Sequence, residues 1–181
     1  MNNDHTTFME QTIEFAQSTN PIWPFGAMIV NAKGEILCKA ADCAHISPLF
    51  HAESLAIHAL ITAKQGQVHG KLTMYTTCEP DTLAYSAIYW AKKVHELQID
   101  EIVYGTMLET ITHLWVFGID IKAKELIELS YKPSIILTGP FMERECNKLF
   151  MEAKEIQVKI NSPHPSNGRL PTHLEAFYKV F

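Results

Sequence analysis

The residues from Ala52 to Ala63 carry the clearest periodic pattern in the chain. Apolar side chains recur there at intervals of three and four, at Ala52, Leu55, Ala56, Ala59, Leu60 and Ala63. This spacing places them on one face of a helix, and that face has to be buried against other elements. Short apolar runs of strand length lie before and after this helix. The alternation of strands and helices predicts a layered α/β fold.

Five strands are expected from these runs. The turn at Lys33-Gly34 predicts a hairpin between the first two, which makes the sheet mixed rather than purely parallel. Gly105 is expected to close the fourth strand. The predicted ranges are 25–30, 35–41, 72–76, 101–104 and 134–137.

Helices are expected between and around these strands. The first is capped by Asp4 or Thr6, and the third starts with Pro80 in its first turn and buries Tyr89 and Trp90. The predicted ranges are 4–18, 52 to near 66, 80–93, 109–116, 121–129 and 140–157.

Composition excludes several classes of protein. The 181 residues include four cysteines, too few for a disulfide-stapled scaffold, and no two of them form a C-x-x-C pair. A net charge of −5 and only two arginines make nucleic-acid binding improbable. No apolar run reaches the roughly 20 residues of a membrane span, and the first residues do not resemble a leader peptide. We therefore expect a cytoplasmic protein without a membrane anchor.

Four short blocks occur in a characteristic order. They are Pro24-Phe25-Gly26-Ala27, His51-Ala52-Glu53, Tyr75-Thr76-Thr77-Cys78-Glu79-Pro80 and Ala87-Ile88-Tyr89-Trp90-Ala91. With these blocks the chain resembles the cytidine-deaminase-like superfamily, and is most similar to its guanine and nucleoside deaminases. The resemblance implies a three-layer α/β/α fold, a homodimer, and a small nucleobase or nucleoside as substrate.

The second and third blocks contain the family's metal motif in altered form. The resemblance implies that one histidine and two cysteines hold zinc, and that a glutamate carries protons between the activated water and the base. His51 and Glu53 match this pattern, but Asp81 and Ala84 stand at the two cysteine positions. His51 and Asp81 are then an incomplete metal set, because a catalytic zinc needs three protein ligands. Zinc is the cofactor that the family implies, and the two substitutions predict weak zinc binding or no cofactor.

Further site residues follow from the same resemblance. It places Phe25, Asp42 and Ala52 on the substrate side of the pocket, although Phe25 is equally compatible with an ordinary core position. Asp42 falls near a family asparagine that hydrogen-bonds the base, and a carboxylate can only accept. Cys43 and His45 offer a weak alternative as additional metal ligands.

Two functional hypotheses follow. In the first, the protein keeps the deaminase fold but lacks normal zinc-dependent deamination. In the second, a rebuilt metal site supports deamination of a purine-type base or nucleoside, with Glu53 as the catalytic proton shuttle. We expect residues 1–160 to form the deaminase-like domain. Residues 161–181 are expected to form a linker and a tail that docks on a partner subunit.

Overall fold

A single mixed β-sheet organises the structure, a computed structural model that describes residues 4–64, 68, 70–115, 118–119, 121–131 and 135–161. The strand order is β2-β1-β3-β4-β5. β1 pairs antiparallel with β2 and β3, whereas β3, β4 and β5 are parallel, which confirms the predicted mixed five-stranded sheet. The strands are β1 Gly26–Asn31, β2 Ile36–Ala41, β3 Leu72–Cys78, β4 Ile99–Thr106 and β5 Ile136–Thr138.

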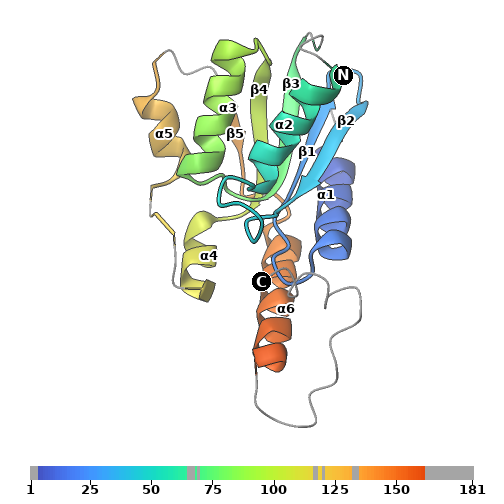
Figure 1. The fold of residues 1–181 in the computed structure, drawn as a ribbon, viewed down its shortest axis with the longest axis vertical. Coiled ribbons are helices and arrows are strands. Elements are labelled where there is room, and N and C mark those ends of the chain that lie inside the picture. Colours follow the sequence, from blue (N-terminus) through green and yellow to red (C-terminus); the bar gives the residue numbers. More distant parts are fainter. Residues whose placement is uncertain are drawn as a thin grey trace.

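Helices cover both faces of this sheet (Figure 1). α2 and α3 pack together on one face, and α1 and α6 pack on the other, which gives the expected three layers. α4 packs against α6, and α5 packs against α3. The helices are α1 His5–Thr19, α2 Ala52–Lys64, α3 Thr82–Val94, α4 Leu108–Trp115, α5 Ala123–Leu129 and α6 Glu143–Asn161.

The periodic face of α2 belongs to the larger of two main core clusters. Ala52, Ala56 and Leu60 are buried there with side chains of β1, β3, β4 and α3. A second cluster on the opposite face joins Met9 of α1 and Cys146 of α6 to Tyr75 and other strand residues. Burial on both sides explains why β3 is buried along its whole length.

Several boundaries differ from the sequence-based expectation. β4 continues through Gly105 to Thr106. A β-carbon at Gly105 would lie 2.1 Å from Cys146 Sγ, so glycine at this position permits close packing rather than ending the strand. Pro80 lies before α3, and Asp81 is the residue that caps this helix. Trp90 was expected in the core, but it is 60% exposed.

The first helix begins as predicted, because the Asp4 side chain accepts a hydrogen bond from the Thr7 N–H. The predicted helix end near residue 66 and the tail from 162 onward lie outside the described residues. The division between domain and tail therefore stays a prediction. Across the described ranges, no helix combines the length and the apolarity that a membrane crossing requires.

Candidate active-site cavity

A cavity of about 350 Å³ lies where the starts of α2 and α3 meet the start of β1 and the ends of β2 and β3. It brings together the positions that the family resemblance assigns to metal binding, catalysis and substrate binding: Phe25, Asp42, His51, Ala52, Glu53, Asp81 and Ala84. Further lining residues are Trp23, Ala44, His45, Cys78, Glu79, Leu108, Ile111 and Gly118. Its volume is at the lower end of the range for small-molecule sites, and suits one heterocycle better than a polymer.

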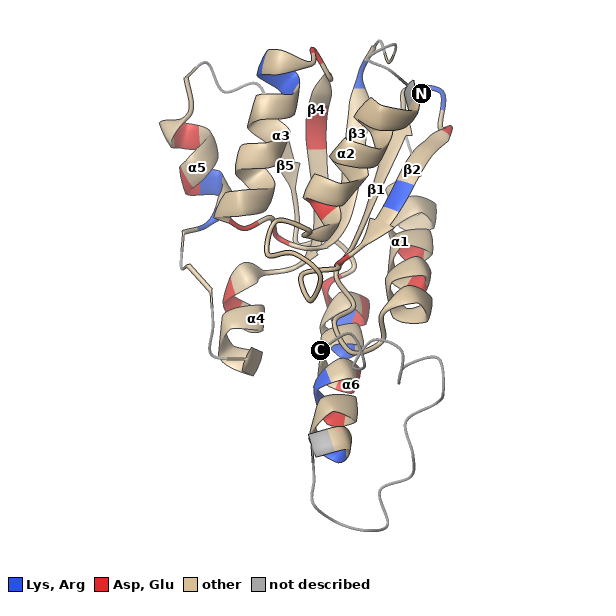
Figure 2. Cartoon of the chain, in the orientation of Figure 1, with Lys and Arg blue, Asp and Glu red and all other residues tan. Residues whose placement is uncertain are grey.

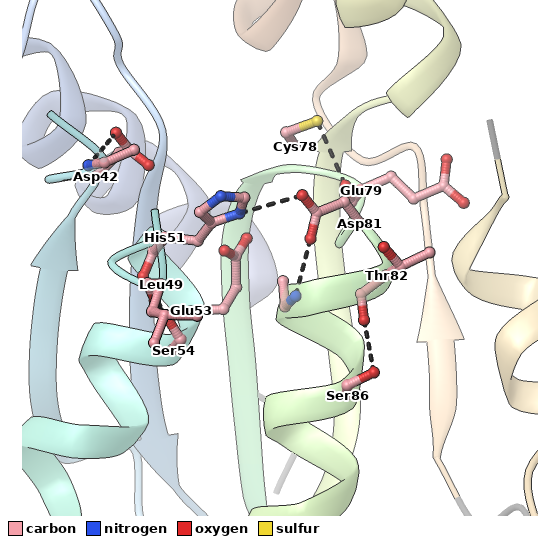
Figure 3. Close-up of polar contacts among 12 residues, drawn as sticks. Asp42, Leu49, His51, Glu53, Ser54, Cys78, Glu79, Asp81, Thr82 and Ser86 are labelled. Atoms are coloured by element: carbon pink, nitrogen blue, oxygen red, sulfur yellow. Dashed lines mark hydrogen bonds and ion pairs between the residues drawn. The ribbon is translucent and has the colours of Figure 1, made fainter. Parts of the chain in front are cut away.

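His51 and Asp81 contact each other across the starts of two helices. His51 immediately precedes α2, and its Nδ1 lies 3.1 Å from Asp81 Oδ2 (Figure 3). The other Asp81 oxygen, Oδ1, accepts the Ala84 N–H at 2.8 Å and caps α3. Burial opposes ionisation of Asp81, but the hydrogen bonds from His51 and Ala84 outweigh it and lower the pKa of Asp81. The hydrogen bond to Asp81 in turn raises the pKa of His51.

Glu53 is more deeply buried than Asp81, the acidic residue that contacts His51. Its side chain lies in the first turn of α2, is 6% exposed, and accepts a hydrogen bond from the Thr76 hydroxyl of β3. Burial raises the pKa of Glu53 to about 7, against the opposing effect of Thr76. A carboxyl group with such a pKa can both donate and accept a proton near neutral pH.

The donor atoms near His51 do not fit a catalytic zinc site, which uses three protein ligands and one open position. His51 and Asp81 supply two donors, and the methyl group of Ala84 supplies none. Within the ranges that the structure describes, no group of three His, Cys, Asp or Glu side chains is placed to hold a metal. Of the alternative ligands, His45 lines the cavity, whereas Cys43 does not.

Asp42 lines another part of the cavity, at the end of β2. It is 9% exposed, and its Oδ1 accepts the Ala44 N–H at 3.0 Å. Burial raises the pKa of Asp42, against the effect of the Ala44 N–H. The buried amide of Asn20 fixes its backbone, since Asn20 Nδ2 donates to the Asp42 carbonyl at 3.2 Å. Asn20 Oδ1 accepts the Trp23 N–H at 3.0 Å, so one amide links two walls of the cavity.

Aromatic side chains form a wall that sequence reasoning largely missed. The Phe25 ring lies 4.9 Å from Phe150, and the Trp23 ring lies 5.2 Å from Trp115, measured between centroids. Trp115 Nε1 donates to Gln157 Oε1 at 2.6 Å, and Gln157 Nε2 donates to a backbone carbonyl before β1. Through its contact with Phe150, Phe25 packs against a core cluster, and it also lines the cavity. Trp23 adjoins a motif block, but nothing in the sequence pattern brings Trp115 or Gln157 to it.

Glu79 is a second residue whose role the sequence did not reveal. It is buried, and its two oxygens accept the Leu108 N–H at 3.2 Å and the Ala123 N–H at 3.0 Å. These N–H groups lie at the starts of α4 and α5, where intrahelical partners are lacking. Glu79 therefore holds two helices against the end of β3, beside the cavity. The neighbouring Cys78 is buried in a core cluster and also lines the cavity.

The sequence comparison identifies the family. The profile of the cytidine and deoxycytidylate deaminase zinc-binding region matches residues 2–106, more than half of the chain. The chain belongs to this deaminase family. The matched range includes both positions at which the altered metal motif departs from the family pattern.

Solved structures support the same deaminase fold. A guanine deaminase from Nitrosomonas europaea superposes with a TM-score of 0.66 at 14% identity, covering 81% of this chain and 82% of that chain. A tRNA:A34 deaminase gives a TM-score of 0.60 at 22% identity, with 80% and 99% covered. A mutant protein in complex with 8-azaguanine gives 0.69 at 14% identity, with 84% and 87% covered. These likenesses show the deaminase fold. No curated protein sequence matches this chain significantly.

Proposed function

We propose that this protein is a relative of guanine and nucleoside deaminases that binds a nucleobase-sized molecule but lacks normal zinc-dependent deamination. The observation that carries the proposal is the position of Ala84. This buried residue lines the cavity in the first turn of α3, and it offers no donor to a metal beside His51 and Asp81. Water is a poor nucleophile at neutral pH without a metal that lowers its pKa.

The contacts of Asp81 support this proposal. One of its oxygens caps α3 and the other pairs with His51, so Asp81 has a structural role that needs no metal. A carboxylate also prefers harder ions than zinc, and it replaces a thiolate poorly in a zinc site. The pair of His51 and Asp81 therefore stabilises the junction of the two helices in place of the family's ligand set.

An active aminohydrolase is the second candidate, and the state of Glu53 favours it. Its pKa of about 7 and its place in the cavity suit a group that moves protons. In that case a rebuilt metal site that includes His51 and Asp81 would supply the activated water, and Glu53 would transfer protons to the base and the leaving amine. The substrate class would be a purine-type base or nucleoside.

Two measurements on the purified full-length protein separate these candidates. The first is its metal content, and the second is ammonia release from guanine, adenine, cytosine and their nucleosides. We expect less than stoichiometric zinc and no ammonia release above that of Glu53→Ala. Stoichiometric zinc together with ammonia release that Glu53→Ala abolishes would establish the second candidate.

We also propose a homodimer in which residues 161–181 dock on the partner subunit, in keeping with the family resemblance. The tail contains three aromatic residues, Phe177, Tyr178 and Phe181, which are suited to packing in an interface. Removing residues 170–181 should change the oligomeric state or lower the melting temperature. An unchanged dimer of unchanged stability would contradict the proposed docking.

A further inference from the structure

The two helical layers that cover the sheet differ in their surface charge. α2 and α3 pack side by side on one face of the sheet, whereas α1 and α6 cover the other face. No Asp, Glu, Lys or Arg occurs from Ser54 to Ala63 in α2 or from Thr82 to Ala91 in α3, whereas α6 carries charges of both signs along its length (Figure 2). A helix with a solvated outer side normally presents charged and polar residues there. The outer side of α2 and α3 therefore resembles a covered surface.

This outer side, the α2–α3 face, presents a large aromatic side chain. Trp90 is 60% exposed and Val94 is 64% exposed, and the Tyr89 ring contacts Trp90 edge-on at 5.6 Å between centroids. Tryptophan and tyrosine often anchor protein–protein contacts, and the centres of such contacts are poor in charge. The composition of the face therefore fits a protein partner. Its described exposed residues are His58, Ala59, Thr62, Ala63, Ser86, Trp90, Lys93 and Val94.

The shape of this face favours a second copy of the chain as the partner. Trp90 is a bulky projection on α3, and Ala59 and Ala63 form a strip of small side chains, one helical turn apart, on the neighbouring α2. When two copies pack around a two-fold axis with antiparallel helices, each Trp90 can lie on the alanines of the other copy. A two-fold contact needs this reciprocity, because the same surface has to supply both the projection and the strip.

Charges at the two ends of α3 favour the same arrangement. Asp81 caps the start of this helix, and Lys92 and Lys93 lie in its last turn. Lys92 pairs with Asp100, so the exposed Lys93 is the lysine available for an intermolecular contact. Antiparallel packing brings the basic end of each α3 beside the acidic start of the other, whereas parallel packing would bring like charges together. With a net charge of −5 on each chain, two copies approach most readily through an uncharged face.

We propose that the α2–α3 face binds a second copy of this chain in a two-fold, antiparallel contact anchored by Trp90. The inference rests on the homodimer of the proposed function, and it goes further by naming the surface and the anchor residue. The contact involves described residues of two helices, so it depends neither on the docking of residues 161–181 nor on a metal.

Ala59→Glu tests the contact with little risk to the fold, because Ala59 is exposed and glutamate is a good helix former. The substitution places a carboxylate from each copy in the uncharged face. We expect the dissociation constant of the full-length dimer, measured by analytical ultracentrifugation, to rise at least about a hundredfold. Met151→Glu, at an exposed position of α6, is the matched control and should leave it unchanged. A wild type that stays monomeric, or a dimer unaffected in folded Ala59→Glu, would overturn the proposal.

Trp90→Ala tests the anchor and does not depend on the folding of Ala59→Glu. We expect the dissociation constant to rise about thirtyfold or more, as for a residue that dominates an interface. The emission of Trp90 should shift to shorter wavelength as the protein associates. The difference between wild type and Trp90→Phe separates this signal from those of Trp23 and Trp115. An unchanged dissociation constant in folded Trp90→Ala, or a Trp90 emission that does not change on association, would show that Trp90 is not the anchor.

Deletion of residues 170–181 separates this proposal from the docking of the tail. If the deletion weakens the dimer and Ala59→Glu does not, the tail docking is retained and the contact through the α2–α3 face is lost. If Ala59→Glu dissociates the dimer and the deletion changes neither the oligomeric state nor the stability, the face is retained and the tail docking is lost. Metal content and ammonia release test the function of the cavity independently of both.

Discussion

Two sides of the cavity differ in how they are built. The acidic side consists of His51, Glu53 and Asp81 at the starts of α2 and α3, together with the methyl group of Ala84. The aromatic side consists of Trp23 and Phe25, supported by the side chains of Trp115, Phe150 and Gln157. The acidic side comes from two short sequence motifs. The aromatic side is assembled from the segment before β1 and from α4 and α6, which are far apart in the sequence.

The acidic side supplies the groups that can take part in chemistry, whereas the aromatic side shapes the cavity. The proposal places the loss of zinc chemistry on the acidic side, where two substitutions remove both thiolates. The aromatic side is held by a connected set of ring and amide contacts that involves none of the acidic-side residues. The following predictions test whether the two sides can be changed independently.

The largest effect is expected from restoring the two cysteines. Asp81→Cys combined with Ala84→Cys would provide two thiolates one helical turn apart, next to His51. We expect zinc binding to rise from below stoichiometric to one ion per chain, measured by metal analysis after dialysis. Asp81→Cys alone is the control and should bind far less. A double variant that folds without binding zinc would show that the acidic side has lost the geometry as well as the ligands.

A smaller effect, on stability, is expected from the aromatic side. Gln157→Leu leaves the Trp115 N–H and the Ile22 carbonyl without their side-chain partner. The free energy of unfolding should fall by about 2–4 kcal/mol, measured by urea denaturation. Gln17→Leu is the matched control, because Gln17 is exposed and its amide donates to Glu152, also at the surface. Its cost should stay below about 0.5 kcal/mol. Equal costs would show that the buried amide does not hold the aromatic side together.

The pH dependence of stability tests the acidic side. Burial raises the pKa of Glu53 from its ordinary 4.5 to about 7 in the folded protein. The unfolded chain therefore loses this proton first, so stability falls as the pH rises from about 4.5 to 7. Glu53→Gln should reduce this slope and be the more stable form at pH 8, by at most about 3 kcal/mol. The measurement is urea denaturation at pH 4.5, 6, 7 and 8. A steeper slope in the variant would contradict the assignment.

The smallest effect is expected at the helix start. Asp81→Asn keeps a good capping side chain for α3 but weakens the pair with His51, and should cost at most about 1 kcal/mol. Asp81→Ala removes both contacts and should cost about 1–2 kcal/mol. The measurement is the melting temperature near pH 6, which should fall from the wild type to Asp81→Asn and then to Asp81→Ala. A greater cost for asparagine than for alanine would show that the cap is not the main role of Asp81.

Much of this structure could be predicted from the sequence. The order of strands and helices, the hairpin and the buried face of α2 follow from local periodicity and turn residues. The ends of elements were harder to predict. Gly105 was expected to end β4, but the strand continues through it, and Cys146 of α6 packs closely against this glycine. The prediction that Trp90 is buried was wrong for a related reason. Only tertiary packing decides which side of a helix stays exposed.

By itself, the sequence determined the family, the mixed sheet and the identity of the residues at the acidic side. These features depend on motifs and spacings within one or two turns of chain. Only the tertiary structure decided that Asp81 both caps α3 and pairs with His51, that Glu79 holds two helices, and that Asn20 links Trp23 to Asp42. The physical reason is that a buried polar group takes its partner from whichever segment packs beside it. A local sequence pattern does not identify that segment.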